Sequence, residues 1–482
     1  MLSAPRRIAR EEWRFWRRSK LMLAASVVVV FLVITALITT TGRISSEQTQ
    51  RREMQTIAED TFKSQPARHP HRMVHYGHYV FRTPTPLAAI DPGVDAYAGT
   101  VMFLEGHRQN SAVFSPFYTA AQTPHLAQLT PARAYLLLLP LVLILAGYAS
   151  VTRERAAHTD RMLLMSDLTP GAIVLGKVLA MLQLTGVLLI PLAGALIVLV
   201  VKGACPIASS ILFIGFALYL AVWSLLTVAV SRFASNASRA VLVLLSLWVG
   251  LGLILPAASA RLATTITPTH GKIETDLDVV SALKDKGDGH NANDPAFEKI
   301  RTNLLTQYNV ETVEELPVNI RGIVAEAAEA EQAVIMSEFA EDHWSEERAQ
   351  AVTARQLGWL SPALAMRAVS MIMVGTDIDQ HHQFQRDAEA SRLEFVQALN
   401  RLQAEGITYA DDISRSNDRA AEKRTRVDAS NWQRLRTFEL KPPPVFARMG
   451  AAAPYFAMLT LWLIAVTVVL MRSARTLGHD HG

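Results

Sequence analysis

Six windows of the chain are almost purely apolar for about 20 residues each, the length of helix that crosses ~30 Å of hydrocarbon. Apart from Lys177 and the terminal residues Arg133 and Arg472, these windows carry no charged side chain. Because charge is costly in lipid, this pattern is typical of membrane spans. We therefore predict an all-α membrane protein with six transmembrane helices, at residues 21–41, 133–150, 173–201, 211–230, 240–258 and 453–472.

Three prolines, Pro140, Pro191 and Pro256, fall inside these windows. A membrane helix tolerates proline because neighbouring groups can satisfy the carbonyls that proline frees. The first window is longer than the apolar run of a secretory signal, and no clear small-x-small cleavage site follows it. We interpret it as an uncleaved anchor rather than a signal peptide.

The basic residues predict the orientation. Lys and Arg are frequent before the first span, in the loop at 151–172, between spans four and five, and after the last span. The positive-inside rule therefore places residues 1–20 and the tail at 473–482 in the cytoplasm, with the bacterial inner membrane as the expected location. Cys205, the single cysteine, should then be labelled from outside.

Two polar stretches, at residues 42–132 and 261–450, are external in this topology. In the second, apolar residues recur at intervals of three and four, which predicts long amphipathic helices. One such stripe consists of Phe384, Ala388, Val396, Leu399 and Leu402. We expect the stripes to pack on one another in a largely helical external (periplasmic) domain, with a partner-binding surface as the alternative.

Composition excludes several classes of function. A net charge of +4 over 482 residues is too small to indicate nucleic-acid binding. One cysteine excludes an intramolecular disulfide framework and a thiolate metal cluster. Ser224 and Ser246 stand in spans without a general base, which argues against an intramembrane hydrolase. We expect no catalytic site on this chain.

The stretch GAIVLGKVLAM, which begins at Gly171, has the glycine and lysine spacing of a phosphate-binding loop. Val178 stands where that loop needs a Ser or Thr hydroxyl to bind Mg²⁺. The residues before it predict a helix broken at Thr169-Pro170, not a strand. We conclude that no ATP binds here; Gly171 and Gly176 serve helix initiation and close packing, and Lys177 is a cytoplasmic anchor.

The segment SVTRERAAHTDRMLLMSDLTPGAIVLGKVLAM, which begins at Ser150, resembles the cytoplasmic signature of type-2 ABC exporter (ABC-2) permeases. The resemblance implies a coupling helix within residues 151–172 and a separate pair of ABC ATPase subunits that bind the ATP and Mg²⁺. The apolar face of that helix would sit in a cleft of the ATPase. The residues implied in coupling are Glu154, Arg155, Arg161, Met162, Leu163 and Leu164.

The segment AREEWRFWRRSKLML, just before the first span, resembles the elbow helix of the same family. Its arginines and tryptophans are also typical of a helix that lies on anionic lipid. A plain basic flank would explain the arginines but not both tryptophans. The elbow residues we single out are Trp13, Trp16, Arg17 and Arg18.

Two further stretches, at residues 75–110 and 359–377, resemble a subgroup of these permeases that carries a large external domain of unknown function. The family resemblance implies the six-span fold of a type V exporter, which works in pairs, so a second permease copy or a related permease is expected. The implied function is export of an unidentified substrate, without a nucleotide site on this chain. The alternative is mechanotransmission, in which ATP hydrolysis drives the external domain against an envelope partner.

Histidines cluster in PARHPHRMVHYGHYVF, which contains His69, His71, His75 and His78. Imidazoles, here with a neighbouring methionine thioether, suit Cu or Zn. The spacings match no closed site, however, and His-rich tracts are only a compositional signal. His75 and His78 also fall inside the external resemblance, where they can simply pack. Packing is our expectation, and metal binding is the alternative hypothesis.

Overall fold

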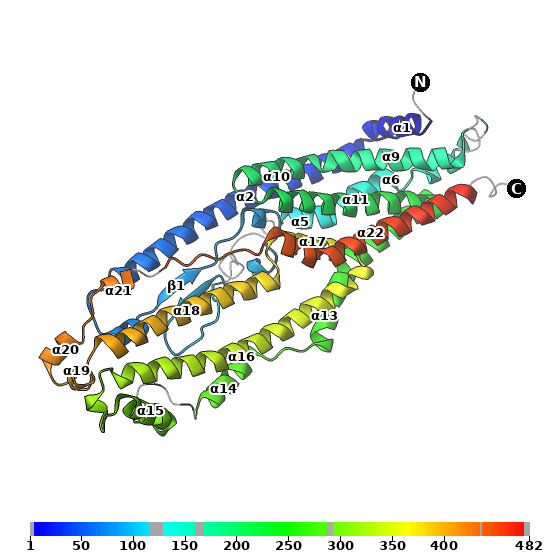
Figure 1. The fold of residues 1–482 in the computed structure, drawn as a ribbon. Coiled ribbons are helices and arrows are strands. Elements are labelled where there is room, and N and C mark those ends of the chain that lie inside the picture. The colour runs from blue at the N-terminus through cyan, green and yellow to red at the C-terminus, as the bar shows by residue number, and fades with distance from the viewer. Residues whose placement is uncertain are drawn as a thin grey trace.

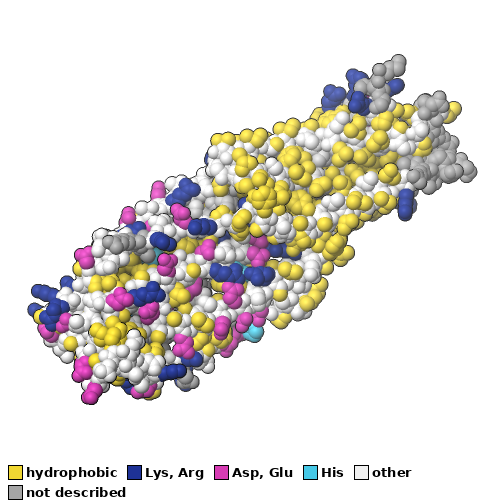
Figure 2. All heavy atoms as spheres, viewed as in Figure 1, with side chains coloured by type: hydrophobic (Ala, Val, Ile, Leu, Met, Phe, Trp, Pro, Cys, Tyr) yellow, Lys and Arg dark blue, Asp and Glu magenta, His cyan; other side chains and the backbone are white. Residues whose placement is uncertain are grey.

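The structure of the chain, a computed structural model, describes residues 4–114, 129–159, 165, 168–284, 286, 289, 291, 293–433 and 436–476. It is an elongated helical molecule with two parts (Figure 1). The membrane domain (4–41, 129–266 and 445–476) has a mostly apolar surface, whereas acidic and basic side chains cover the polar domain (42–114 and 267–444; Figure 2).

Six helical segments of the described chain are long and apolar enough to cross a membrane, and each overlaps one predicted window. This confirms an all-α, multi-pass membrane protein. The first is part of α2 (Lys20–Lys63) and the fourth is α11 (Pro206–Phe233). The second segment consists of α5 (Pro131–Arg133), η4 (Ala134–Leu138), α6 (Leu139–Gly147) and α7 (Thr152–Ala156), and the third of α9 (Pro170–Leu188) and α10 (Ile190–Val201). The fifth consists of α12 (Ala237–Val249), η5 (Gly250–Ile254) and α13 (Leu255–Ile266), and the sixth lies in α22 (Val445–Thr476).

Local rearrangements accommodate the three prolines. Pro140 and Pro256 each follow a π-helical turn, η4 and η5. At Pro191 the Tyr135 hydroxyl accepts from the Leu192 amide at 3.1 Å and donates to the Leu188 carbonyl at 3.0 Å. A neighbouring helix thus satisfies the groups that the break exposes, as expected for proline inside a membrane.

The polar domain begins as a direct continuation of the first span, because α2 runs on to Lys63 without a break. The remaining elements from the first polar stretch are α3 (Pro70–Val74), β1 (His78–Phe81), η1 (Pro86–Ala89), η2 (Gly93–Ala96) and β2 (Val101–Leu104). The second stretch forms α14 (Lys272–Leu283), η6 (Pro295–Phe297), α15 (Glu298–Tyr308), η7 (Val313–Glu315), α16 (Ile320–Gln356), η8 (Leu357–Trp359), α17 (Pro362–Val374), α18 (Ile378–Gly406), α19 (Tyr409–Ser414), α20 (Arg419–Arg424) and α21 (Ser430–Gln433).

The predicted apolar stripe on α18 is present, but it packs differently from our expectation. Phe384 and Ala388 contact the hairpin of β1 and β2, an antiparallel pair that we did not predict. Val396 and Leu399 pack with Phe62 of α2 and with α3. The stripe is therefore covered by the first polar stretch together with residues from 427–433 and 436–440, and ion pairs such as Arg386–Glu341 face α16 instead.

Helix α17 belongs by sequence to the second polar stretch, yet it packs among the spans. Its residues Met366 and Val369 lie against α11, where a Cβ on Gly215 would come within 3.1–3.2 Å of them. The Ser361 hydroxyl before it donates to the Leu251 carbonyl at 2.6 Å. The structure thus differs from a wholly external segment at 261–450. Thirteen residues are too few to span a membrane, so hydropathy gave no signal for this helix.

Both described ends of the chain lie at the same end of the molecule, far from the polar domain (Figure 1). Helix α7 lies at that end too, because its Arg153 contacts Glu12 near the N-terminus. This agrees with the even number of spans and with a shared side for the two termini. We call this the terminal end of the membrane domain.

Candidate functional site

The N-terminal helix α1 (Ala4–Arg18) lies along α9 at the terminal end (Figure 1). Trp16 is buried, and its indole N–H donates to the Ala146 carbonyl at 2.9 Å. The Trp13 indole donates to the Gln183 side chain at 3.0 Å. Sequence reasoning assigned both tryptophans to a lipid surface; the structure gives them protein partners instead. Arg17 and Arg18 are exposed.

Close packing of α1 on α9 requires Gly176. A Cβ at this position would lie 2.6 Å from the Ile8 Cβ and 2.9 Å from the Pro5 carbonyl oxygen. The packing role predicted for Gly176 is confirmed. Gly171 has no atom within 4 Å of such a Cβ, so it makes no close contact. It follows Pro170, where α9 begins as predicted, capped by the Thr169 side chain.

Lys177 is buried rather than anchored in solvent, with 1% of its side chain exposed. Its ammonium contacts Glu12 of α1 at 2.5 Å and also Glu154 of α7. Arg153 approaches the same Glu12 at 2.9 Å. Burial of a lysine requires such carboxylate partners. We call Glu12, Arg153, Glu154 and Lys177 the terminal charge cluster; it joins α1, α7 and α9.

Arg155, another residue implied in coupling, binds the end of span four. Its guanidinium donates to the carbonyls of Ala234 and Arg232 at 2.9 and 3.0 Å. A cation is stabilised at this position because the last carbonyls of α11 form the negative end of the helix dipole. Segment 152–156 is therefore tied to three other helices of the membrane domain.

The predicted ATPase-facing residues Arg161, Met162, Leu163 and Leu164 lie outside the described residues. The next apolar position, Met165, is described and is 86% exposed. The coupling helix itself thus stays a prediction. The described residues that precede it are those of α7, which is tied to the membrane domain.

The four candidate histidines separate into two groups. His69 is buried: its Nε2 bonds to Asp412 at 3.0 Å and its Nδ1 accepts the His71 amide at 3.1 Å, which caps α3. His78 is buried against Phe62 and Phe395, and burial lowers its pKa to about 4. Both side chains pack in the interior of the polar domain, as expected from the packing interpretation.

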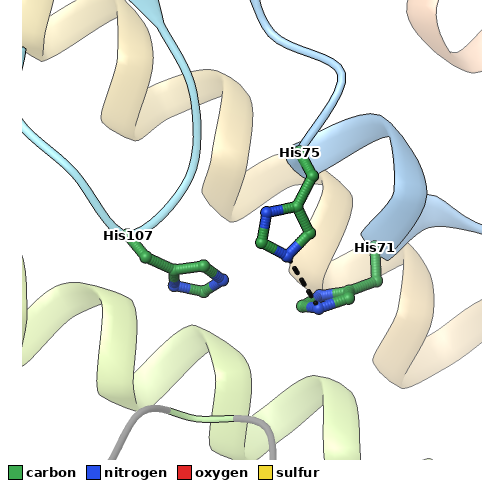
Figure 3. Close-up of side chains that lie close together, drawn as sticks. All are labelled: His71, His75 and His107. Atoms are coloured by element: carbon green, nitrogen blue, oxygen red, sulfur yellow. Dashed lines mark hydrogen bonds between the residues drawn. The ribbon is translucent and has the colours of Figure 1, made fainter.

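The other two, His71 and His75, meet a histidine that we did not consider as a ligand. One ring nitrogen each of His71, His75 and His107 lies within 4.8 Å of the other two (Figure 3). The Nε2 atoms of His71 and His75 are 3.2 Å apart. We call these three residues the imidazole cluster. Sequence spacing could not reveal it, because His107 comes from the loop after β2.

A buried carboxylate supports this cluster. Glu329 of α16 lies 3.0 Å from His107 Nδ1 and also accepts the His107 amide at 3.1 Å. Arg392 of α18 contacts the other oxygen of Glu329 at 2.5 Å. Burial disfavours the charged carboxyl, but the hydrogen bond from His107 and the charge of Arg392 outweigh it and lower the pKa of Glu329 to about 2.

Residues 272–441 match a family described as "Domain of unknown function (DUF3526)". The matched range runs from α14 to the residues before α22, and so includes α16, α17 and α18. No curated protein matches the chain. The similarity therefore covers about a third of the chain and assigns no activity to it.

Proposed function

We propose that this chain is the transmembrane permease subunit of an ATP-binding cassette exporter of the type-2 class, with ATP hydrolysed by a separate pair of ATPase subunits. It would act in the bacterial inner membrane with both termini in the cytoplasm, paired with a second copy or a related permease. In this proposal the chain is no enzyme by itself and needs no cofactor of its own.

The observation that carries the proposal is the terminal charge cluster. Lys177 joins Glu12 of α1 to Glu154 of α7, so the N-terminal helix and the loop before span three form one unit. A subunit that receives force from an ATPase needs such a unit, because a loosely attached loop would dissipate the movement. Arg155 extends the connection to span four.

Within this unit, residues 161–165 would form the contact with the ATPase. Burial of about three apolar side chains there would contribute on the order of 5 kcal/mol before the cost of association. Leu164→Asp should therefore weaken ATPase association and uncouple hydrolysis from transport while the chain still inserts in the membrane. Ala156→Asp, which adds the same charge at an exposed position, is the matched control.

The direct test is affinity purification of the tagged chain from native membranes in mild detergent, with mass spectrometry and an ATPase assay. Recovery of a soluble ATPase in stoichiometric amount, with vanadate-sensitive activity, would support the proposal. Recovery of the chain without any ATPase would contradict it.

Mechanotransmission is the second candidate, and two features favour it. Helix α2 continues from the first span into the polar domain without a break. Helix α17 lies against α11 while its carboxyl end is bound to the first polar stretch, where the Thr376 hydroxyl donates to the Asp91 carbonyl at 3.0 Å. Movement of the spans would therefore reach the polar domain directly. Cross-linking of the polar domain to an envelope protein only in the presence of ATP would favour this candidate over export.

A further inference from the structure

We propose that His71, His75 and His107 bind a divalent transition-metal ion, with Zn²⁺ and Cu²⁺ the best matched. Neutral imidazole nitrogens suit these ions, whereas Mg²⁺ and Ca²⁺ prefer oxygen ligands. The site would lie in the polar domain, and this proposal does not depend on the permease function proposed above.

The distances are close to those of a ligated site. Two imidazole nitrogens bound to one tetrahedral Zn²⁺ at ~2.0–2.1 Å are separated by roughly 3.3–3.4 Å. The Nε2 atoms of His71 and His75 already lie 3.2 Å apart. The nitrogen of His107 lies within 4.8 Å of both, so a shift of roughly 1–1.5 Å completes a three-histidine set at that same spacing.

The backbone positions these side chains before any ion arrives. His71 and His75 are four residues apart at α3, a spacing that places two side chains on one helix face. Met73 and Val74 between them are buried in the core of the polar domain, which fixes the orientation of α3. The pair is thus presented by a short helix that cannot turn freely.

The loop that carries His107 is pressed onto the same helix. The Gly106 amide donates to the Val74 carbonyl at 3.0 Å, and a Cβ on Gly106 would lie 2.1 Å from a Val74 methyl group. Only glycine permits this approach. His107 itself has a φ of 64°, in the left-handed region that few residues other than glycine adopt. The chain thus accepts local strain at the residue that completes the cluster.

Glu329 provides the support that metal-binding histidines commonly have. Its carboxylate lies 3.0 Å from His107 Nδ1, and a proton on that nitrogen would leave the lone pair of Nε2 for a metal ion. Figure 3 shows the His107 ring directed towards His71 and His75. Arg392 holds Glu329 in turn at 2.5 Å. This carboxylate–histidine arrangement orients the ligand and raises its basicity.

The fourth coordination position faces solvent, because His75 is exposed and the other two histidines are half-buried. Three protein ligands with one open position allow an ion to enter and leave, unlike a closed four-ligand site. Bound metal would link α3 to the loop after β2 and, through Glu329, to α16. We therefore infer an exchangeable site that stabilises the polar domain when it is loaded.

The test is isothermal titration of Zn²⁺ and Cu²⁺ into the full chain, purified in detergent with a tag free of histidine and treated with a chelator. His479→Ala and His481→Ala are included throughout, because the tail GHDHG could bind metal by itself. We expect one ion per chain with a Kd below about 1 μM and a rise in Tm on loading.

Single variants identify the ligands. His75→Ala removes an exposed side chain, so it should weaken binding at least 100-fold without loss of fold. Glu329→Gln should weaken binding roughly 10- to 100-fold. His270→Ala, a change at an exposed histidine elsewhere in the polar domain, is the matched control and should have no effect. In the Cu²⁺ form, electron paramagnetic resonance should show coupling to three nitrogens.

Two results would overturn the proposal. One is the absence of binding below about 10 μM for both ions in the chelator-treated chain. The other is binding that His75→Ala and His107→Ala leave unchanged, which would place the ion elsewhere. Because the readouts are binding and spectroscopy, the outcome does not depend on whether the chain transports anything.

Discussion

At the terminal end, Lys177 joins α1, α7 and α9, whereas in the polar domain Arg392 joins α16, α18 and the loop after β2. Both cations are almost completely buried, each with two carboxylate partners. The terminal charge cluster lies at the edge of an apolar domain. Arg392 is one of several ion pairs along the contact between α16 and α18.

The difference follows from what surrounds each cluster. In the membrane domain, close packing at Gly176 and one buried charge cluster hold α1 on α9. Between α16 and α18, paired charges replace the apolar contact that we expected. The polar domain should therefore respond more strongly to loss of a charge and to acid, and the membrane domain to changes of shape.

The largest effect is expected from Arg392→Met. The change leaves Glu329 and Glu389 buried without their cation, which should destabilise the polar domain by about 3–5 kcal/mol. Thermal unfolding of the full chain, followed by circular dichroism, measures it. Arg386→Met is the control: its pair with Glu341 is half-exposed, so the loss should stay below about 1 kcal/mol. Equal losses would show that burial does not set the importance of these pairs.

Lys177→Met should destabilise the terminal end by about 3 kcal/mol, at the lower end of the range for a broken buried pair. Arg153 still neutralises part of the Glu12 charge. We expect α1 to detach, so trypsin should cleave after Arg17 faster than in the wild type. Lys202→Met, at an exposed lysine, should leave cleavage unchanged. Unaltered cleavage in Lys177→Met would mean that the tryptophan hydrogen bonds and the packing on Gly176 hold α1 without the lysine.

Acid should destabilise the polar domain through His78. Its pKa is about 4 in the folded chain, because it is buried, and near its ordinary value of 6.5 when unfolded. The unfolded chain therefore binds the proton first, and stability falls as pH drops from about 6.5 to about 4, by roughly 3 kcal/mol in all. Two charged groups also act on His78: Glu59 raises its pKa and Lys63 lowers it.

His78→Phe isolates this contribution, since the ring replaces the imidazole between Phe62 and Phe395 without a group to protonate. Its Tm should fall less between pH 7 and pH 4.5 than that of the wild type. Parallel curves for the two proteins would assign the acid sensitivity to other groups.

The smallest effect concerns shape. Gly176→Ala forces Ile8 and the Pro5 carbonyl away from α9, which should cost about 1–3 kcal/mol. Gly171→Ala, five residues earlier in the same helix, meets no atom within 4 Å and should cost nothing measurable. Trypsin cleavage in α1 again reports the difference. Equal cleavage of the two variants would show that close packing of α1 on α9 does not require glycine at position 176.

The sequence was sufficient for features that depend on neighbours along the chain. Long apolar windows predicted the six spans, and the Thr169-Pro170 cap predicted where α9 begins. It failed where partners are distant. Lys177 read as a solvent anchor because Glu12 is 165 residues away, and His107 was passed over because its partners lie on α3. Hydropathy could not place α17 among the spans, because its length is that of an ordinary buried helix.

The position of α17 also constrains how the protein is made. It packs against α11, which is synthesised long before it, and against α22, which begins about 70 residues after it. At a translation rate of roughly 5–20 residues per second, the synthesis of α22 begins about 4–14 s after that of α17 ends. Until then its apolar face is open to chaperones and proteases. A chain truncated before Val445 should therefore be degraded rather than accumulate, because α17 then lacks one of the helices against which it packs.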